Sequence, residues 1–83
     1  MKYMVAELLF TVIKAWYENK MICMLLSDGK EVRFPVSKNK KLDNANDQQR
    51  GNIEIICSGT GLHWPDLDED LSLTGIMEGR YGH

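Results

Sequence analysis

The clearest alternation of hydrophobic and polar positions predicts a β-hairpin. Residues 21–26 (MICMLL) are apolar on both faces, which is typical of a central strand. Residues 31–36 (EVRFPV) carry an apolar side chain at every second position, as a strand with one buried face does. Between them, Asp28-Gly29 favours a two-residue type I′ turn. Because Pro35 cannot donate a backbone hydrogen bond, we expect the second strand to end there or to lie at a sheet edge.

The segment before this hairpin carries two competing patterns. Six apolar side chains follow the i, i+3, i+4 spacing of an amphipathic helix: Val5, Leu8, Leu9, Val12, Ile13 and Trp16. Residues 10–17, however, are rich in β-branched and aromatic types, and the turn-like Glu18-Asn19-Lys20 follows. The sequence favours a strand over residues 8–17, with a helix as the alternative for its N-terminal part.

The second half of the chain predicts shorter elements. Residues 37–52 are polar, and Asn46 with Gln49 forms a capping-box pattern for a short helix that Gly51 closes. Residues 53–57 (IEIIC) predict a last strand. Ser72 can cap a final helix that ends at Gly79. We therefore expect one α+β domain over residues 1–83, a small antiparallel sheet of about four strands with two short helices.

Composition excludes several classes of protein. The chain has 83 residues, 43% of them hydrophobic and 27% charged, with a formal net charge of −2. No overall positive field therefore draws it to nucleic acid or to an anionic membrane. Its apolar runs are broken by charges well before the roughly 20 residues of a membrane span, and no signal-peptide cleavage pattern follows them. We expect a cytoplasmic location and no membrane partner.

The two cysteines, Cys23 and Cys57, lie in apolar runs. Buried free thiols in a reducing compartment are the favoured interpretation, and a single disulfide is the alternative.

Three stretches resemble one known family. GTGLHWPDLDEDLSLTGIMEG (residues 59–79) has a glycine-rich turn, then His-Trp-Pro-x-Leu-Asp-x-Asp, a serine and a short glycine-containing helix. AWYENKMICMLLSDGKEV (15–32) resembles paired strands with an Asp-Gly turn. NANDQQRGNIEI (44–55) resembles the segment Ala-Thr-Pro-x-x-Arg-x-Asn-Trp, with four residues in matching places: Ala45, Gln49, Arg50 and Asn52. Over residues 10–79 the chain resembles the DUF2442 family of small bacterial proteins.

The resemblance implies an α+β domain with an antiparallel sheet and no established catalytic activity. Some relatives are fused to helix-turn-helix domains, and others are encoded beside a second small protein in a toxin–antitoxin-like arrangement. This chain departs from the family where residues 38–42 replace an aromatic pair followed by Pro-Arg-Leu, and where Ile53 replaces a frequent Trp. The resemblance therefore implies the fold of the family more directly than it implies a binding partner in common with the family.

Two charged clusters are candidate contact surfaces. The acidic cluster holds Asp66, Asp68, Glu69 and Asp70, and the basic cluster holds Lys38, Lys40 and Lys41, with Arg50 nearby. The alternating aspartates could face one way and hold Mg²⁺ or Ca²⁺, but the EF-hand pattern is missing. We favour carboxylates gathered before a helix N-terminus, and expect no metal. The lysines could contact phosphates, although no aromatic residue stands among them for base stacking.

The remaining signature residues predict structural roles. His63 could act as a general base, but the chain offers no nucleophile motif to accompany it. We expect Trp64 to fill the core, Pro65 to stiffen a turn and His63 to bond a backbone group. Gly59 and Gly61 flank Thr60 in a loop that lacks the length and lysine of a phosphate-binding loop, so a tight turn explains them.

We therefore predict a protein without catalytic activity or cofactor. The first hypothesis is a protein-interaction module, the antitoxin-like or regulatory half of a two-protein system, whose small partner could be co-encoded. An exposed sheet edge, the 37–44 segment and the acidic cluster would supply its contacts. The alternative is a nucleic-acid-binding adaptor or regulator that acts through residues 38–41. A homodimer is compatible with either hypothesis.

Overall fold

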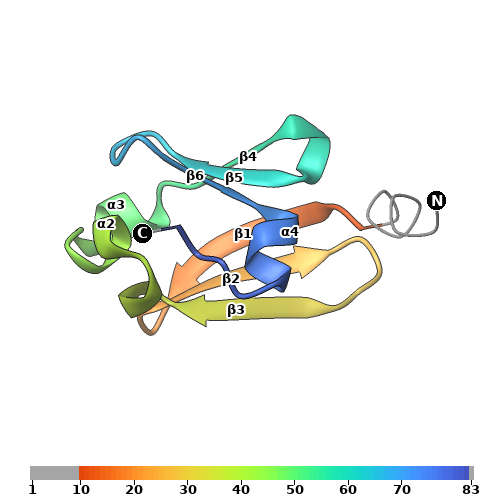
Figure 1. Ribbon diagram of the computed structural model, residues 1–83, viewed down its shortest axis with the longest axis horizontal. Coiled ribbons are helices and arrows are strands. Elements are labelled where there is room, and N and C mark those ends of the chain that lie inside the picture. Colours follow the sequence, from red (N-terminus) through yellow and green to blue (C-terminus); the bar gives the residue numbers. More distant parts are fainter. Residues whose placement is uncertain (1–9, 83) are drawn as a thin grey trace.

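The computed structural model describes residues 10–82, which fold into two three-stranded antiparallel sheets and short helices (Figure 1). The first sheet has the order β1-β2-β3, with β1 at Val12–Glu18, β2 at Met21–Leu26 and β3 at Glu31–Pro35. The second has the order β4-β5-β6, with β4 at Glu54–Ile56, β5 at Gly61–Trp64 and β6 at Glu69–Ser72. Helices α2 (Lys40–Asp43) and α3 (Asp47–Gly51) connect the sheets, and α4 (Leu73–Met77) follows β6.

The α+β class and the antiparallel pairing are confirmed, but the described residues hold six strands rather than about four, and three short α-helices rather than two. The additional strands are β5 and β6, which pair with each other around residues 65–68. Each has only four residues, and neither GLHW nor EDLS shows the strict alternation of apolar and polar types that identifies a strand. The strand prediction for residues 8–17 holds from Val12 onward, and its first two residues lie outside the described part.

Several local predictions are confirmed. The apolar strand β2 is central, and β3 is an edge strand that ends at Pro35. Asn46 and Gln49 form the capping box of α3. The Ser72 side chain caps α4 by accepting a hydrogen bond from the backbone N–H of Gly75, and Gly79 follows the helix with φ of 83°. Side-chain capping therefore sets the helix boundaries here.

The turn expected at Glu18-Asn19-Lys20 is confirmed, whereas the turn between β2 and β3 differs in type from the prediction. Between β1 and β2, Asn19 and Lys20 both have positive φ, 50° and 61°, as a type I′ turn requires. Between β2 and β3 only Gly29 has positive φ, and the N–H of Leu26 donates to the Lys30 carbonyl across three residues. The type I′ prediction for Asp28-Gly29 is therefore wrong, since Gly29 instead ends a three-residue loop.

Because Lys20 adopts a left-handed conformation, Lys20→Gly should stabilise the protein. A non-glycine residue there costs about 1 kcal/mol, and the greater freedom of glycine in the unfolded chain offsets part of the gain. We expect about 0.5 kcal/mol of added stability in urea unfolding. Lys30→Gly is the matched control, because Lys30 lacks a positive φ and should lose stability. A Lys20→Gly variant no more stable than Lys30→Gly would contradict this assignment.

One hydrophobic core lies between the two sheets. The inner face of the first sheet contributes Ile22, Met24 and Phe34, which are fully buried. Leu62 and Trp64 enter from the second sheet, and α4 covers the remaining space (Figure 1). The C-terminal segment runs back across the core, where the Tyr81 ring stacks on Phe34 with centroids 4.7 Å apart.

The cysteines differ in environment. Cys23 is buried on β2, and its burial raises the pKa of its thiol. Cys57 is exposed in the turn Cys57–Gly59 with φ of 55°, so the prediction that both thiols are buried is wrong for this residue. Both thiols are free, as expected.

Candidate functional site

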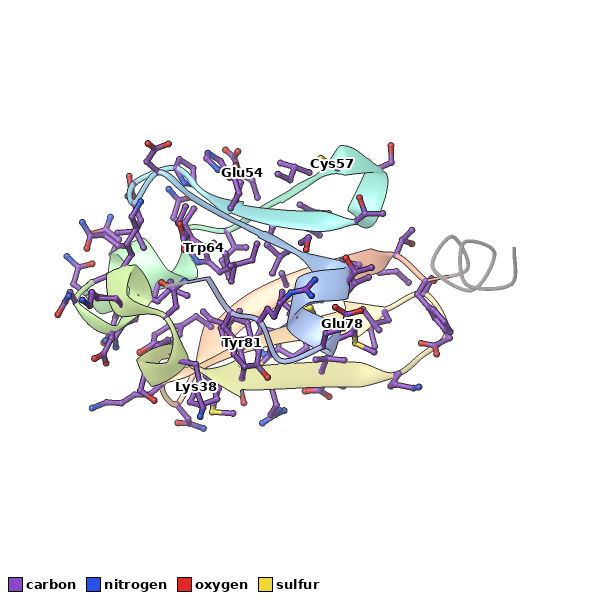
Figure 2. All side chains as sticks on the ribbon, in the orientation of Figure 1. Lys38, Glu54, Cys57, Trp64, Glu78 and Tyr81 are labelled. Atoms are coloured by element: carbon purple, nitrogen blue, oxygen red, sulfur yellow. The ribbon has the colours of Figure 1, made fainter. Side chains whose placement is uncertain are left out.

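The β5–β6 hairpin divides the signature block, residues 59–72, between two faces. Pairing across the second sheet sets Leu62 opposite Leu71 on the inner face, where both are buried. The next row, Glu54, His63 and Asp70, points the other way because successive strand residues alternate. Figure 2 shows Trp64 between the sheets and Glu54 on the far side of the second sheet.

Trp64 has the structural role that the sequence predicted. Its side chain is fully buried, and its indole N–H donates to the backbone carbonyl of Arg50 at 3.1 Å. This bond links β5 to the end of α3. Gly59, with φ of 91°, lies in the turn between β4 and β5, and a Cβ there would stand 2.7 Å from that of Thr11. The tight-turn prediction therefore holds for Gly59, whereas Gly61 is a buried residue that begins β5.

Arg50 is a buried structural residue, so it does not belong to the exposed basic cluster with which the sequence grouped it. Its guanidinium donates to the carbonyls of Leu42 and Asp43 at 2.9 and 3.0 Å. A third bond, of 2.9 Å, reaches the hydroxyl of Tyr17 on β1. Arg50 thereby joins α2, α3 and the first sheet, and it also pairs with Asp47 at 3.6 Å, so its guanidinium is engaged in internal contacts.

Asn39 organises a second buried polar group that the sequence analysis missed. Its side-chain oxygen caps α2 by accepting from the N–H of Leu42 at 3.0 Å. Its amide nitrogen donates to the Glu69 carboxylate at 2.7 Å and to the Tyr81 carbonyl at 2.6 Å. A sequence signal was available, because asparagine is among the residues most favoured at a helix N-cap.

Glu69 differs from the other acids of the acidic cluster because its carboxylate accepts the hydrogen bond from Asn39. Its side chain is buried, and its second oxygen lies 3.8 Å from the ammonium of Lys41. Lys41 also donates to the backbone carbonyl of Asp68 at 3.0 Å. Glu69 and Lys41, which we expected on contact surfaces, therefore make contacts within the protein instead. Through Lys41 the basic cluster contacts the acidic cluster at Asp68 and Glu69.

The other acids form what we call the acidic face: Glu54, Asp66, Asp68 and Asp70, all exposed. Asp66 accepts a hydrogen bond from the Asn52 side chain at 3.1 Å. Asp68 has φ of 51° in the turn that joins β5 to β6. The expectation that the aspartates collect just before a helix N-terminus is wrong, because Asp66 and Asp68 lie in the β5–β6 turn and Asp70 lies within β6. Within residues 10–82, no group of three His, Cys, Asp or Glu residues is arranged to hold a metal.

His63 lies at the centre of the acidic face. Its Nδ1 contacts the Asp70 carboxylate rather than a backbone group, which corrects the sequence prediction. The Asp70 hydrogen bond raises the pKa of His63 above its ordinary value of about 6.5. The charges of Glu54 and Asp68 raise it further, while partial loss of hydration acts in the opposite direction. A proton on His63 therefore reduces the negative charge of this face.

The raised pKa predicts a pH dependence. Protonated His63 stabilises the folded state fully below about pH 6.5, and this contribution disappears as pH rises through the higher folded pKa. Asp70→Asn should lower the pKa of His63 in an NMR titration. The stability difference between wild type and this variant should be largest below about pH 6.5 and should shrink as pH rises through the raised pKa of His63. Identical His63 titrations in the two proteins would contradict the assignment.

The basic cluster is smaller than the sequence suggested. Lys38 ends the turn Val36–Lys38 and Lys40 begins α2, and both are exposed. Figure 2 shows Lys38 beside the first sheet, away from Glu54 on the second. Two lysines therefore remain as candidates for an external anion. Pro65, the last predicted signature residue, is exposed at the start of the β5–β6 turn.

None of the helices in residues 10–82 is long and apolar enough to cross a membrane.

Comparison with known proteins places the chain in a family. Residues 12–82 match the model of DUF2442, described as a protein of unknown function. A crystal structure of a protein of unknown function from Rhodospirillum rubrum is similar, with 37% identity and a TM-score of 0.82, and the match covers 89% of this chain and 92% of that one. A solution NMR structure of an uncharacterised protein from Chromobacterium violaceum has 30% identity and a TM-score of 0.81, over 98% of this chain and 76% of that one. No curated protein matched. The chain therefore belongs to the DUF2442 family.

Proposed function

We propose that this chain is a non-enzymatic protein-interaction module, the antitoxin-like or regulatory half of a two-protein system in the cytoplasm. Its acidic face would bind a small basic protein. The observation that supports this proposal is the division of the signature block. The inward residues, such as Trp64, hold the sheets together, whereas the outward row of Glu54, His63 and Asp70 has no structural role in the core.

The charge of the acidic face is largely uncompensated. Among residues 10–82, the side chains of Glu54, Asp66 and Asp68 form no ion pair. Among the ion pairs of the described residues, Asp70 forms one with His63, which is mostly protonated below its raised pKa. A basic partner would complement this field, and such complementarity gives fast association and selectivity. The β4 strand at the sheet edge offers backbone groups beside the same face.

The alternative function, a nucleic-acid adaptor, has weaker support. Lys38 and Lys40 are exposed, but Lys41 is engaged by Asp68 and Glu69, and Arg50 is buried. Two lysines would release few counterions, so they would supply little affinity for a phosphate backbone. The acidic face would also repel the same polyanion.

The test is affinity capture from lysate of the source organism with the tagged chain. The variant Glu54→Gln/Asp66→Asn/Asp68→Asn removes three charges and keeps side-chain shape, and asparagine tolerates the positive φ at residue 68. The control Asp43→Asn/Glu78→Gln removes exposed acids elsewhere. We expect one small basic protein in near-stoichiometric amount with wild type and control, lost with the triple variant. Equal recovery with the triple variant, or no partner with any protein, would contradict the proposal.

A further inference from the structure

The outer face of the first sheet, opposite the core, has an unusual central strand. The register places three rows across this face: Lys14, Leu25 and Glu31, then Trp16, Cys23 and Arg33, then Glu18, Met21 and Pro35. The centre of each row comes from β2 and is apolar. The edges of the first two rows carry charges or an aromatic ring. We call these nine residues the outer grid.

A solvated outer face would place polar residues on β2. The inner residues of β2 are Ile22, Met24 and Leu26, which belong to the core. Its outer residues, Met21, Cys23 and Leu25, are equally apolar, a pattern typical of strands covered on both faces. Cys23 is fully buried, while Met21 and Leu25 remain partly exposed to solvent. In residues 10–82, the second sheet and α4 lie on the inner side of the first sheet (Figure 1). The outer grid therefore has the composition of a surface that binds another molecule.

We propose that a second copy of this chain covers the outer grid, face to face, with a two-fold axis parallel to β2. This goes beyond the proposed function, because the acidic face lies on the other sheet. The axis sets each β2 against its equivalent, so that Leu25 meets Leu25 of the second copy. Each β1 then lies against β3 of the other copy at the same height along the strand.

Charge complementarity selects this axis. Within one chain, Arg33 pairs with Glu31, the Lys14 ammonium lies 5.6 Å from the centroid of the Trp16 ring, and the Trp16 indole donates to Glu18. The axis extends these contacts by placing Lys14 opposite Glu31 of the second copy and Trp16 opposite the Arg33 guanidinium of the second copy, and each pair occurs twice. Oppositely charged pairs and guanidinium–indole contacts are both favourable. A two-fold axis across the strands would also pair Lys14 with Glu18 of the second copy, but it would set Arg33 against Arg33 and Glu31 against Pro35. The axis parallel to β2 therefore gives the more complementary isologous contact, because it brings no like charges together.

The size of the grid limits the affinity. Three short strands cover less than the roughly 1,200–2,000 Å² that stable interfaces bury. We expect a dimer that dissociates in the micromolar range. Its formation would leave the acidic face free for a different partner.

Sedimentation equilibrium of the full chain, from micromolar to millimolar concentration, tests this proposal. Wild type should pass from monomer to dimer. Leu25→Lys would place two ammonium groups together at the axis and should abolish dimer formation. Met77→Lys is the matched control, because Met77 is 50% exposed on α4, and it should dimerise like wild type. Circular dichroism of each protein shows whether the fold is retained.

Exchanging the charges of Lys14 and Glu31 distinguishes this interface from non-specific association. Lys14→Glu and Glu31→Lys should each weaken the dimer about tenfold, since each reverses two contacts. The combined variant should restore dimerisation towards wild type, because the reversed charges again face each other. A wild-type monomer at every concentration would overturn the proposal. A dimer insensitive to Leu25→Lys would also overturn it.

Discussion

Replacing Trp64 by alanine should lower the free energy of unfolding by about 3–5 kcal/mol, the largest effect expected for any single substitution in this chain. The indole is fully buried between the sheets, so its removal leaves a cavity bordered by both. The Arg50 carbonyl also loses its donor. For a domain of this size, the loss is comparable with its whole stability, and the variant should be largely unfolded at 37 °C.

Urea unfolding followed by circular dichroism measures this effect. Trp64→Phe keeps most of the volume but leaves the Arg50 carbonyl unpaired, so it should cost about 1–3 kcal/mol and remain measurable. Trp16→Ala, at low protein concentration, is the matched control, because Trp16 is half-buried on the outer face of the first sheet. A loss for Trp64→Ala no greater than that for Trp16→Ala would show that Trp64 does not hold the sheets together.

The second large effect is expected for Arg50→Met, which should cost about 2–4 kcal/mol. Methionine preserves the length of the side chain but removes every donor. The carbonyls of Leu42 and Asp43 and the hydroxyl of Tyr17 then lose their bonds to the guanidinium. Because these groups lie on separate elements, the connection between α2, α3 and the first sheet should weaken.

The same unfolding experiment applies to Arg50→Met. Arg80→Met removes an exposed arginine that pairs with Glu78 and should change stability by less than about 0.5 kcal/mol. Arg50→Lys tests the geometry, since a single ammonium cannot bond the three acceptors together, and it should recover only part of the loss. If Arg50→Lys were as stable as wild type, the fold would require the positive charge at residue 50 rather than the three hydrogen bonds of the guanidinium.

Elements defined by strong local rules could be predicted from the sequence. The apolar run of β2, the Asn46–Gln49 capping box and the Ser72 cap depend on neighbouring residues alone. The strands β5 and β6 could not be predicted, because each has four residues and is stabilised by pairing with the other and by Trp64 in the core. The turn at Asn19-Lys20 was also missed as type I′, since lysine rarely adopts positive φ.

The candidate site was predicted in part. Asp66, Asp68 and Asp70 are exposed, as a contact surface requires, but Glu69 is buried by a bond to Asn39, thirty residues away. Glu54 joins the acidic face through strand pairing with His63, a relation that no local pattern reveals. Arg50 was placed with the lysines because charge is visible in a sequence, whereas the three acceptors that bury it are not.

The measurement that tests the acidic face most directly is an NMR titration of the ¹⁵N-labelled chain with its captured basic partner. The largest amide shift changes should fall at Glu54, His63 and residues 66–70, and they should diminish as salt is added. Amides of the outer grid should change little. Shift changes centred on residues 38–41, with the acidic face unaffected, would contradict the account.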